Sequence, residues 1–345
     1  MIFLWILLYL VIATAVVFLA TKLSKYVDML DKKTNLSGAL LGGVLLAAVT
    51  SIPELFTSIS AIFILPGAES SAMVIGNILG SDLFNVFVLA VTFIIFYKKF
   101  RDVKIDKGHI STTVTLIIFY LLIAYATLMP DSWQLRIGGA VNVVSVILFV
   151  GYLISVKLIN VNDTVESEED AKESGEEVIT LTVKQIVLRF IALAVLLIGF
   201  SIAITYVTDI IADTLSLGKT FAGALFLGVA TSLPEVSATI ALCKLGNINA
   251  AIGNIIGSNT FNFIILVLAD IVSWVNPVYC FDKQSLLLII FGLISAISMC
   301  AVILCRIFVK DPESEKAKKL EKVLFMVGFF VVIACYISFL ILSNV

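Results

Sequence analysis

The sequence predicts an all-α polytopic membrane protein, because its composition is apolar, its apolar runs are long, and a polar motif occurs twice within them. Of the 345 residues, 60% are hydrophobic and 14% are charged, whereas soluble domains carry about a quarter of their residues charged. The runs are continuous rather than short and alternating, which favours helices over a β-barrel. Residues 2–20 lack a preceding basic segment and a cleavage site of small residues, so we expect a retained span.

Charged residues and turns divide the apolar sequence into ten expected spans. They cover residues 2–21, 38–65, 70–97, 110–129, 133–156, 184–208, 217–243, 247–275, 284–305 and 321–342. The second, third, seventh and eighth spans are long for one crossing, and Pro or Gly interrupts each of them.

Basic residues indicate how these spans are oriented. The loops after spans one, three, five, seven and nine hold 19 of the 23 Lys and Arg residues. Cytoplasmic loops are enriched in Lys and Arg, so we expect both termini outside. Short loops without a large regulatory domain fit a prokaryotic plasma membrane. The net charge of −2 gives no sign of a nucleic-acid partner, and the lipid bilayer is the expected surrounding.

Two sequence motifs each occur twice, in the same order. Residues 42–54 read GGVLLAAVTSIPE and residues 223–235 read GALFLGVATSLPE, with six of thirteen positions identical. Residues 75–85 read IGNILGSDLFN and residues 252–262 read IGNIIGSNTFN, with eight of eleven identical. A duplicated unit of five spans enters the membrane from opposite sides, as in many secondary transporters that bind substrate at the repeat interface.

The duplication divides the chain into three parts. We expect a first five-helix repeat over residues 1–157, an acidic cytoplasmic linker over 158–182 and a second, inverted five-helix repeat over 183–345. The linker is rich in Asp and Glu, which is typical of a solvated segment.

Each copy of the first motif places a glutamate inside an apolar span. An acidic group at a helix centre costs about 2.5–3.5 kcal/mol on insertion scales, so Glu54 and Glu235 are predicted to be functional. Pro53 and Pro234 precede them, and proline removes a backbone hydrogen bond and frees carbonyl oxygens. Hard cations take oxygen ligands from carboxylates and carbonyls. The motif therefore predicts a cation site.

Helical spacing brings further oxygen-bearing side chains to the predicted site. Thr50 and Thr231 lie four residues before the glutamates, and two stripes of residues spaced four apart follow on the third and eighth spans. The stripes are Asn77, Ser81 and Asn85, and Asn254, Ser258 and Asn262. Glycines 76, 80, 253 and 257 beside the stripes allow helices to approach closely. Absence of Lys, Arg and His from the motifs argues against an anion substrate.

On these motifs, TSIPE with GNILGSDLFN and TSLPE with GNIIGSNTFN, the chain resembles the Ca²⁺/cation antiporter superfamily, in its sodium/calcium exchanger branch. The resemblance implies two inverted halves that exchange Ca²⁺ against Na⁺ by alternating access. It implies that Glu54 and Glu235 ligate Ca²⁺ together with Thr50 and Thr231. It also implies that Na⁺ sites use the side chains of Ser51, Ser232, Ser81 and Ser258, with carbonyls from Ala47 and Ala230 or residues nearby.

The chain departs from this family at one pair of positions. Several members have an aspartate where this chain has Asn85 or Asn262, so no third carboxylate is expected there. Asp82 is acidic but lies one residue off the stripe, about 100° around the helix, and we keep it outside the predicted ligand set as a further candidate.

Other functions remain open on the sequence. Proton-coupled cation exchange would use the same glutamates, and a channel would use the same polar path. A membrane-embedded enzyme needs a nucleophile with a base or a His-bound metal. The only histidine, His109, lies in a basic loop far from both motifs. We therefore expect a transporter that is not an enzyme and has no cofactor, with Ca²⁺ and Na⁺, or H⁺, as transported ions.

Overall fold

The computed structural model describes residues 2–34, 50–129, 134–137, 141–163, 181–273, 277–279, 281–308 and 315–343, and nearly all of them are helical. The first half contains helices α1 (Ile2–Thr34), α3 (Ile52–Ile64), α4 (Gly67–Ile95), α5 (Tyr97–Asp102), α6 (Gly108–Leu128) and α7 (Val143–Asp163), with strands β1 (Arg136–Ile137) and β2 (Val141–Asn142). The second half contains α8 (Val183–Thr214), α9 (Lys219–Ala222), the π-helical segment η3 (Gly223–Gly228), α10 (Val229–Leu245), α11 (Ile248–Val272), α12 (Lys283–Phe308) and α13 (Glu315–Leu342).

The described helices have the length and composition of membrane spans. Eight of them are long and apolar enough to cross a bilayer, and Ile52–Ile64 and Val143–Lys157 are shorter apolar helices. The protein is thus an all-helical integral membrane protein. Residues 38–49 of the second predicted span and residues 164–180 of the predicted linker lie outside the described residues.

The fifth span is predicted to begin at residue 133, but the helix that corresponds to it, α7, begins ten residues later. The short strands β1 and β2 pair antiparallel, with Arg136 opposite Asn142 and Ile137 opposite Val141, and α7 begins only at Val143. The apolar composition of this stretch does not distinguish short paired strands from the start of a helix. At the other end, α7 continues to Asp163, beyond the predicted boundary at 157.

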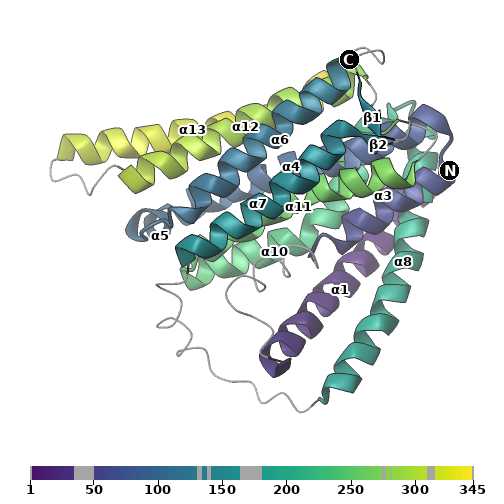
Figure 1. The fold of residues 1–345 in the computed structure, drawn as a ribbon, viewed down its shortest axis with the longest axis horizontal. Coiled ribbons are helices and arrows are strands. Elements are labelled where there is room, and N and C mark those ends of the chain that lie inside the picture. The colour runs from purple at the N-terminus through teal and green to yellow at the C-terminus, as the bar shows by residue number, and fades with distance from the viewer. Residues whose placement is uncertain are drawn as a thin grey trace.

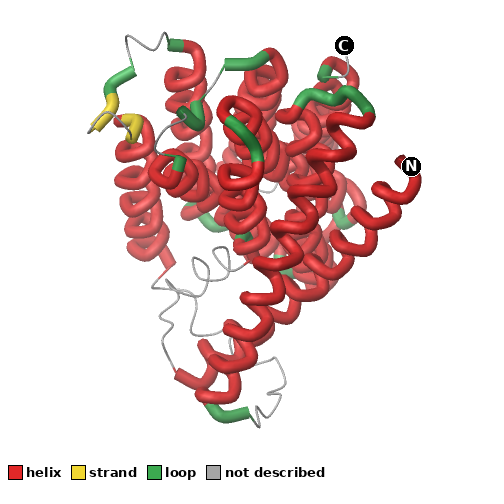
Figure 2. The backbone as a smooth tube through the Cα atoms, turned by 90° about the vertical axis from the view of Figure 1, so that its right-hand side faces the viewer, coloured by secondary structure: helices red, strands yellow, loops and turns green. Residues whose placement is uncertain are grey.

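Two helices separate from the rest of the bundle. Helices α1 and α8 pack side by side and diverge from the remaining helices in Figure 1, and α12 and α13 form another pair. Both chain ends lie on the same side of the molecule in Figures 1 and 2. Helices α4 and α11 have the largest buried share of the described spans, so the second motif of each half lies at the centre of the bundle.

A close helix crossing joins the two halves at this centre. A Cβ on Gly76 would lie 2.1 Å from the carbonyl oxygen of Thr220, and one on Gly80 would lie 2.4 Å from Cα of Ala224. Only glycine permits such an approach of α4 to α9 and η3. The predicted role of these two glycines is confirmed, and the crossing lets Ser81 Oγ donate to the carbonyl of Gly228 at 3.2 Å.

Candidate cation site

The two motif glutamates lie at the centre of the bundle. Glu54 is in the first turn of α3 and Glu235 lies inside α10, and their exposed fractions are 1% and 0%. Their carboxylates are close enough to interact electrostatically, although they come from opposite halves of the chain. The described residues place no basic group against these two buried acids, so either bound cations or protons balance their charge.

The two prolines have different effects on their helices. Pro53 is in the first turn of α3, where a missing N–H costs nothing, and Ser51 caps that helix with non-helical ψ. Pro234 lies inside α10, which continues through it, and the irregularity falls instead in η3, which forms the first six residues of the motif. The predicted break at Pro234 is therefore wrong in position, because the π-helical segment upstream takes up the distortion.

Hydroxyl groups cross from each half to the glutamate of the other. Ser232 Oγ donates to Glu54 Oε1 at 3.3 Å. Thr231 also lies against Glu54, and Thr50 lies against Glu235. Thr50 Oγ1 is also 3.3 Å from Ser258 Oγ. The two hydrogen bonds, Ser232 with Glu54 and Thr50 with Ser258, join residues 178 and 208 positions apart, so the motif copies form one polar centre.

One asparagine in each half holds the glutamate-bearing helix to its neighbour. Asn77 Nδ2 donates to the carbonyl of Glu54 at 3.2 Å, and Asn254 Nδ2 donates to the carbonyl of Glu235 at 3.2 Å. The side-chain oxygens of both asparagines remain buried without a partner among the described residues. Each asparagine therefore fixes a carbonyl near a glutamate and keeps one oxygen available.

The structure adds Asp82 to the polar centre. Asn262 Nδ2 donates to Asp82 Oδ1 at 2.9 Å, and Asp82 is fully buried. Its offset from the stripe directs it toward α11, which packs on α4. Aligning the two repeats would have revealed this position, because Asp82 and Asn259 are equivalent residues and Asn259 also joins the network.

The centre is rich in buried oxygen atoms without hydrogen-bond donors. Nine side-chain oxygens of the two motifs have no partner in the described part of the chain. They are Ser51 Oγ, Glu54 Oε2, both carboxylate oxygens of Glu235, Asp82 Oδ2 and the Oδ1 atoms of Asn77, Asn85, Asn254 and Asn262. Buried acceptors without donors are costly, and carboxylate and amide oxygens are the ligands of hard cations.

The oxygens do not form a compact cluster of acids. No group of three or more His, Cys, Asp or Glu side chains within the described residues is close enough to hold one metal ion together. A cation at the glutamates would therefore be completed by neutral hydroxyl, amide or carbonyl oxygens, which the surrounding motif residues supply.

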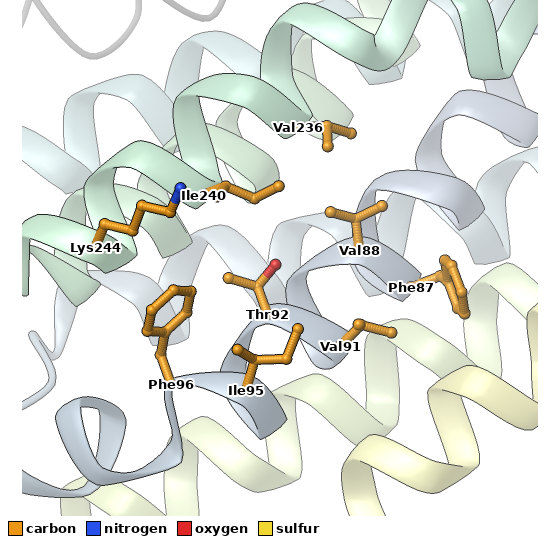
Figure 3. Close-up of a pocket in the computed structure, with 9 residues that line it drawn as sticks. All are labelled: Phe87, Val88, Val91, Thr92, Ile95, Phe96, Val236, Ile240 and Lys244. Carbon is orange, nitrogen blue, oxygen red and sulfur yellow. The ribbon is translucent and has the colours of Figure 1, made fainter.

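A separate cavity lies away from this centre, between α4 and α10. It has a volume of about 390 Å³ and is lined by apolar side chains, with Thr92 and Lys244 as the polar members (Figure 3). Its lining contains none of the predicted ligands, so it is distinct from the polar centre.

The histidine is closer to the second motif than its sequence position suggested. His109 lies in the first turn of α6, and its ring is 3.7 Å from where a Cβ on Gly253 would lie. The expected distance from the second motif is therefore wrong, because α6 packs on α11.

Comparison with known proteins identifies the family. The sequence profile of the sodium/calcium exchanger protein family matches residues 3–158 and 185–342. The uncharacterised membrane protein MJ0091 of Methanocaldococcus jannaschii is 29% identical over 234 residues, covering 67% of this chain and 70% of the relative.

Solved exchanger structures share the fold. The H⁺/Ca²⁺ exchanger CAX superposes with a TM-score of 0.62 at 13% identity, covering 99% of this chain and 90% of the other. The sodium–calcium exchanger NCX_Mj gives 0.53 at 17% identity, covering 97% of this chain and 99% of the other. The profile match extends over both repeats and most of the chain, and the chain therefore belongs to the sodium/calcium exchanger protein family.

Proposed function

We propose that the chain is a secondary-active antiporter that exchanges Ca²⁺ for Na⁺ by alternating access. The observation that carries this proposal is the set of donor-free buried oxygens around Glu54 and Glu235. Two ionised glutamates balance one divalent or two monovalent cations, so different ions can occupy the same centre in turn.

We infer that the ions bind near the membrane midplane, between two inverted five-helix halves. Cross-contacts such as Ser232 with Glu54 support this arrangement, since each half completes the site of the other. A total of ten crossings requires that the shorter helices α3 and α7 also count as spans. For α3, the span would include residues that precede it. The common side of the two chain ends supports an even number of crossings (Figure 1). The excess of basic residues in alternate loops supports outside termini, in a prokaryotic plasma membrane.

In this proposal the ligands come from both repeats. Glu54 and Glu235 provide the charge for Ca²⁺. The remaining ligands are Thr50, Thr231, Ser51, Ser232, Asn77, Ser81, Asn85, Asn254, Ser258 and Asn262, all of which are buried.

Proton-coupled exchange is the second candidate. The fold resembles that of the H⁺/Ca²⁺ exchanger CAX as well as that of NCX_Mj, and buried carboxylates are able to carry protons. A channel is disfavoured because opposed repeats with a shared central site suit alternating access.

The test is Ca²⁺ uptake by proteoliposomes that contain the purified protein. Vesicles loaded with Na⁺ are diluted into Na⁺-free medium containing Ca²⁺, and uptake is compared with vesicles loaded with choline and with vesicles carrying only a pH gradient. We expect uptake that saturates with Ca²⁺ and requires internal Na⁺. Uptake driven by the pH gradient alone would assign the coupling to protons, and uptake without any counter-ion would indicate a channel.

A further inference from the structure

The apolar cavity between α4 and α10 ends at a lysine. The two helices pack on each other, and the cavity of about 390 Å³ lies between them, with Lys244 and Phe96 at one end and Val236 at the other (Figure 3). Ligand pockets commonly have volumes of about 300–1,000 Å³. Ile95 in the lining is 69% exposed, so the cavity opens to the outside of the helix bundle, where the acyl chains of a bilayer lie.

The lysine end of the cavity carries positive charge. The ammonium of Lys99 donates to the carbonyl of Lys244 and lies 5.7 Å from the ring centroid of Phe96. Within the part of the chain that the structure describes, neither lysine forms an ion pair, and Asp102 pairs with Arg101 at 2.7 Å. Two ammonium groups without acids therefore favour an anionic group at this end.

The repeated sequence does not require this charge. Lys244 lies nine residues after Glu235, and the residue nine positions after Glu54 is Phe63, which is 75% exposed. The lysine is thus a feature of the second copy. Lys99 and Lys244 both belong to loops that are predicted to be cytoplasmic, and basic pockets between transmembrane helices on that side bind anionic lipid head groups.

A hydroxyl group adds a third feature to the cavity. The Thr92 hydroxyl is directed into the cavity in Figure 3, one helical turn before Phe96, and it has no hydrogen-bond partner among the described residues. A glycerol ester carbonyl next to the head group accepts a hydrogen bond from such a hydroxyl, whereas a free fatty acid has no polar group at that depth. The cavity therefore matches a phospholipid better than a fatty acid.

We propose that the cavity between α4 and α10 binds one acyl chain of an anionic phospholipid, with the head group at Lys99 and Lys244 and a glycerol ester at Thr92. The lining contains none of the predicted ion ligands, so this lipid site is separate from the cation centre. Val236 directly follows Glu235, and a bound chain would therefore contact the helix that carries one of the two glutamates.

The experiment counts lipids bound to the purified full-length chain. Protein in neutral detergent is titrated with dioleoylphosphatidylglycerol or with dioleoylphosphatidylcholine, which has the same chains but no net charge, and native mass spectrometry counts the bound lipid. The variants are Lys244→Gln, which removes one charge, and Ile240→Trp, which fills the cavity. Lys184→Gln is the matched control, because Lys184 is an exposed lysine at the start of α8, in another loop predicted to be cytoplasmic.

We expect the unsubstituted protein to bind one phosphatidylglycerol more tightly than phosphatidylcholine. One lysine near an anionic head group contributes about fivefold in affinity. Lys244→Gln should therefore bind phosphatidylglycerol about fivefold more weakly, Ile240→Trp should lose the tight binding, and Lys184→Gln should change neither lipid. Equal affinity for the two lipids in the unsubstituted protein would overturn the proposal. Unchanged affinity in Ile240→Trp, or the same fivefold loss in Lys184→Gln, would overturn it too.

A second measurement needs only the unsubstituted protein and applies even if the variants aggregate. Phosphatidylglycerol with a photoreactive diazirine in one acyl chain is crosslinked to the protein, and the labelled peptides are identified. We expect labels within residues 87–96 and 236–244, and labels confined to other segments would overturn the proposal. Displacement of the lipid by equimolar oleate, or by dimer formation, would also overturn it, in favour of a fatty acid or a second copy of the chain. Neither measurement depends on transport, so failure of the proposed antiport leaves this test intact.

Discussion

The first copy of the motif, over residues 50–85, and the second copy, over residues 231–262, differ at several positions, and two of these differences lie next to the glutamates and their partners. The acid Asp82 in the first copy corresponds to the amide Asn259 in the second. Thr57 corresponds to Ala238, which has no hydroxyl, whereas Thr57 Oγ1 lies within hydrogen-bond distance of the carbonyls of Pro53 and Glu54, at 2.8 and 3.1 Å. At these two positions the first copy carries a charge and a hydroxyl that the second copy lacks.

The difference shows that a duplicated site need not be electrically symmetric. Glu54 accepts a hydrogen bond from Ser232, whereas neither carboxylate oxygen of Glu235 has a partner among the described residues. An inverted repeat supplies the same residue types to both sides of a centre, and single substitutions such as Asp82 for Asn then determine the total charge.

The largest effect is expected where the two copies are the same. Glu54→Gln and Glu235→Gln each remove one charge from the centre, and since ligand charge tunes Ca²⁺ affinity over several orders of magnitude, we expect each to lower affinity at least about 100-fold and to abolish uptake. Ca²⁺ uptake by proteoliposomes measures this. Glu69→Gln is the matched control, because Glu69 is an exposed glutamate at the start of α4.

Both glutamate variants should still reach the membrane and elute as monodisperse protein. Wild-type flux in either one would show that the copies are not equivalent at the glutamates, and wild-type flux in both would place the site elsewhere.

A second test changes the asparagine at the end of each stripe, Asn85 or Asn262, because the two have different neighbours. Asn262→Asp places a new carboxylate within hydrogen-bond distance of Asp82, whereas Asn85→Asp places it against the neutral Asn259. Two charges about 4 Å apart repel by about 4 kcal/mol at an effective dielectric constant of 20. We expect Asn262→Asp to be less stable than Asn85→Asp without cations and to gain more thermal stability when Na⁺ or Ca²⁺ is added.

Thermal unfolding of both variants in choline, Na⁺ and Ca²⁺ buffers measures that gain. Equal cation-dependent shifts in Tm would mean that the charge of Asp82 is not felt at position 262, and the electrical difference between the copies would then have no consequence.

Much of this arrangement could be predicted from the sequence, because the strongest constraints are local. A buried glutamate after proline and polar stripes with a spacing of four residues are costly in apolar helices, so their repetition alone identified the polar centre. The spacing also indicated that Gly76 and Gly80 mark a close helix crossing.

The parts that could not be predicted depend on contacts between distant segments. Asp82 lies off the stripe when α4 is taken by itself, and its partner Asn262 comes from the other half of the chain. His109 packs beside Gly253 for the same reason. Local distortion was also missed: hydrophobicity does not distinguish the π-helical segment before Pro234, or the paired strands before α7, from a regular helix.

The smallest effect concerns how firmly each glutamate-bearing helix is held. Asn77 Nδ2 lies within hydrogen-bond distance of three acceptors, the Glu54 carbonyl, Thr57 Oγ1 and Ser58 Oγ, whereas Asn254 reaches two, the Glu235 carbonyl and Thr239 Oγ1. Each buried acceptor left without its donor costs about 1–3 kcal/mol. We therefore expect Asn77→Ala to lower Tm more than Asn254→Ala.

Thr57→Ala is the matched variant, because it gives the first copy the residue of the second. In a Thr57→Ala background, Asn77→Ala should lower Tm about as much as Asn254→Ala lowers it in the unsubstituted protein. In both cases two buried acceptors then lose their donor. A double-mutant cycle on Tm measures this coupling. If Asn254→Ala proves the more costly change, the extra hydroxyl at Thr57 does not strengthen the first copy. The two copies would then differ in their charge but not in how strongly their glutamate-bearing helices are held.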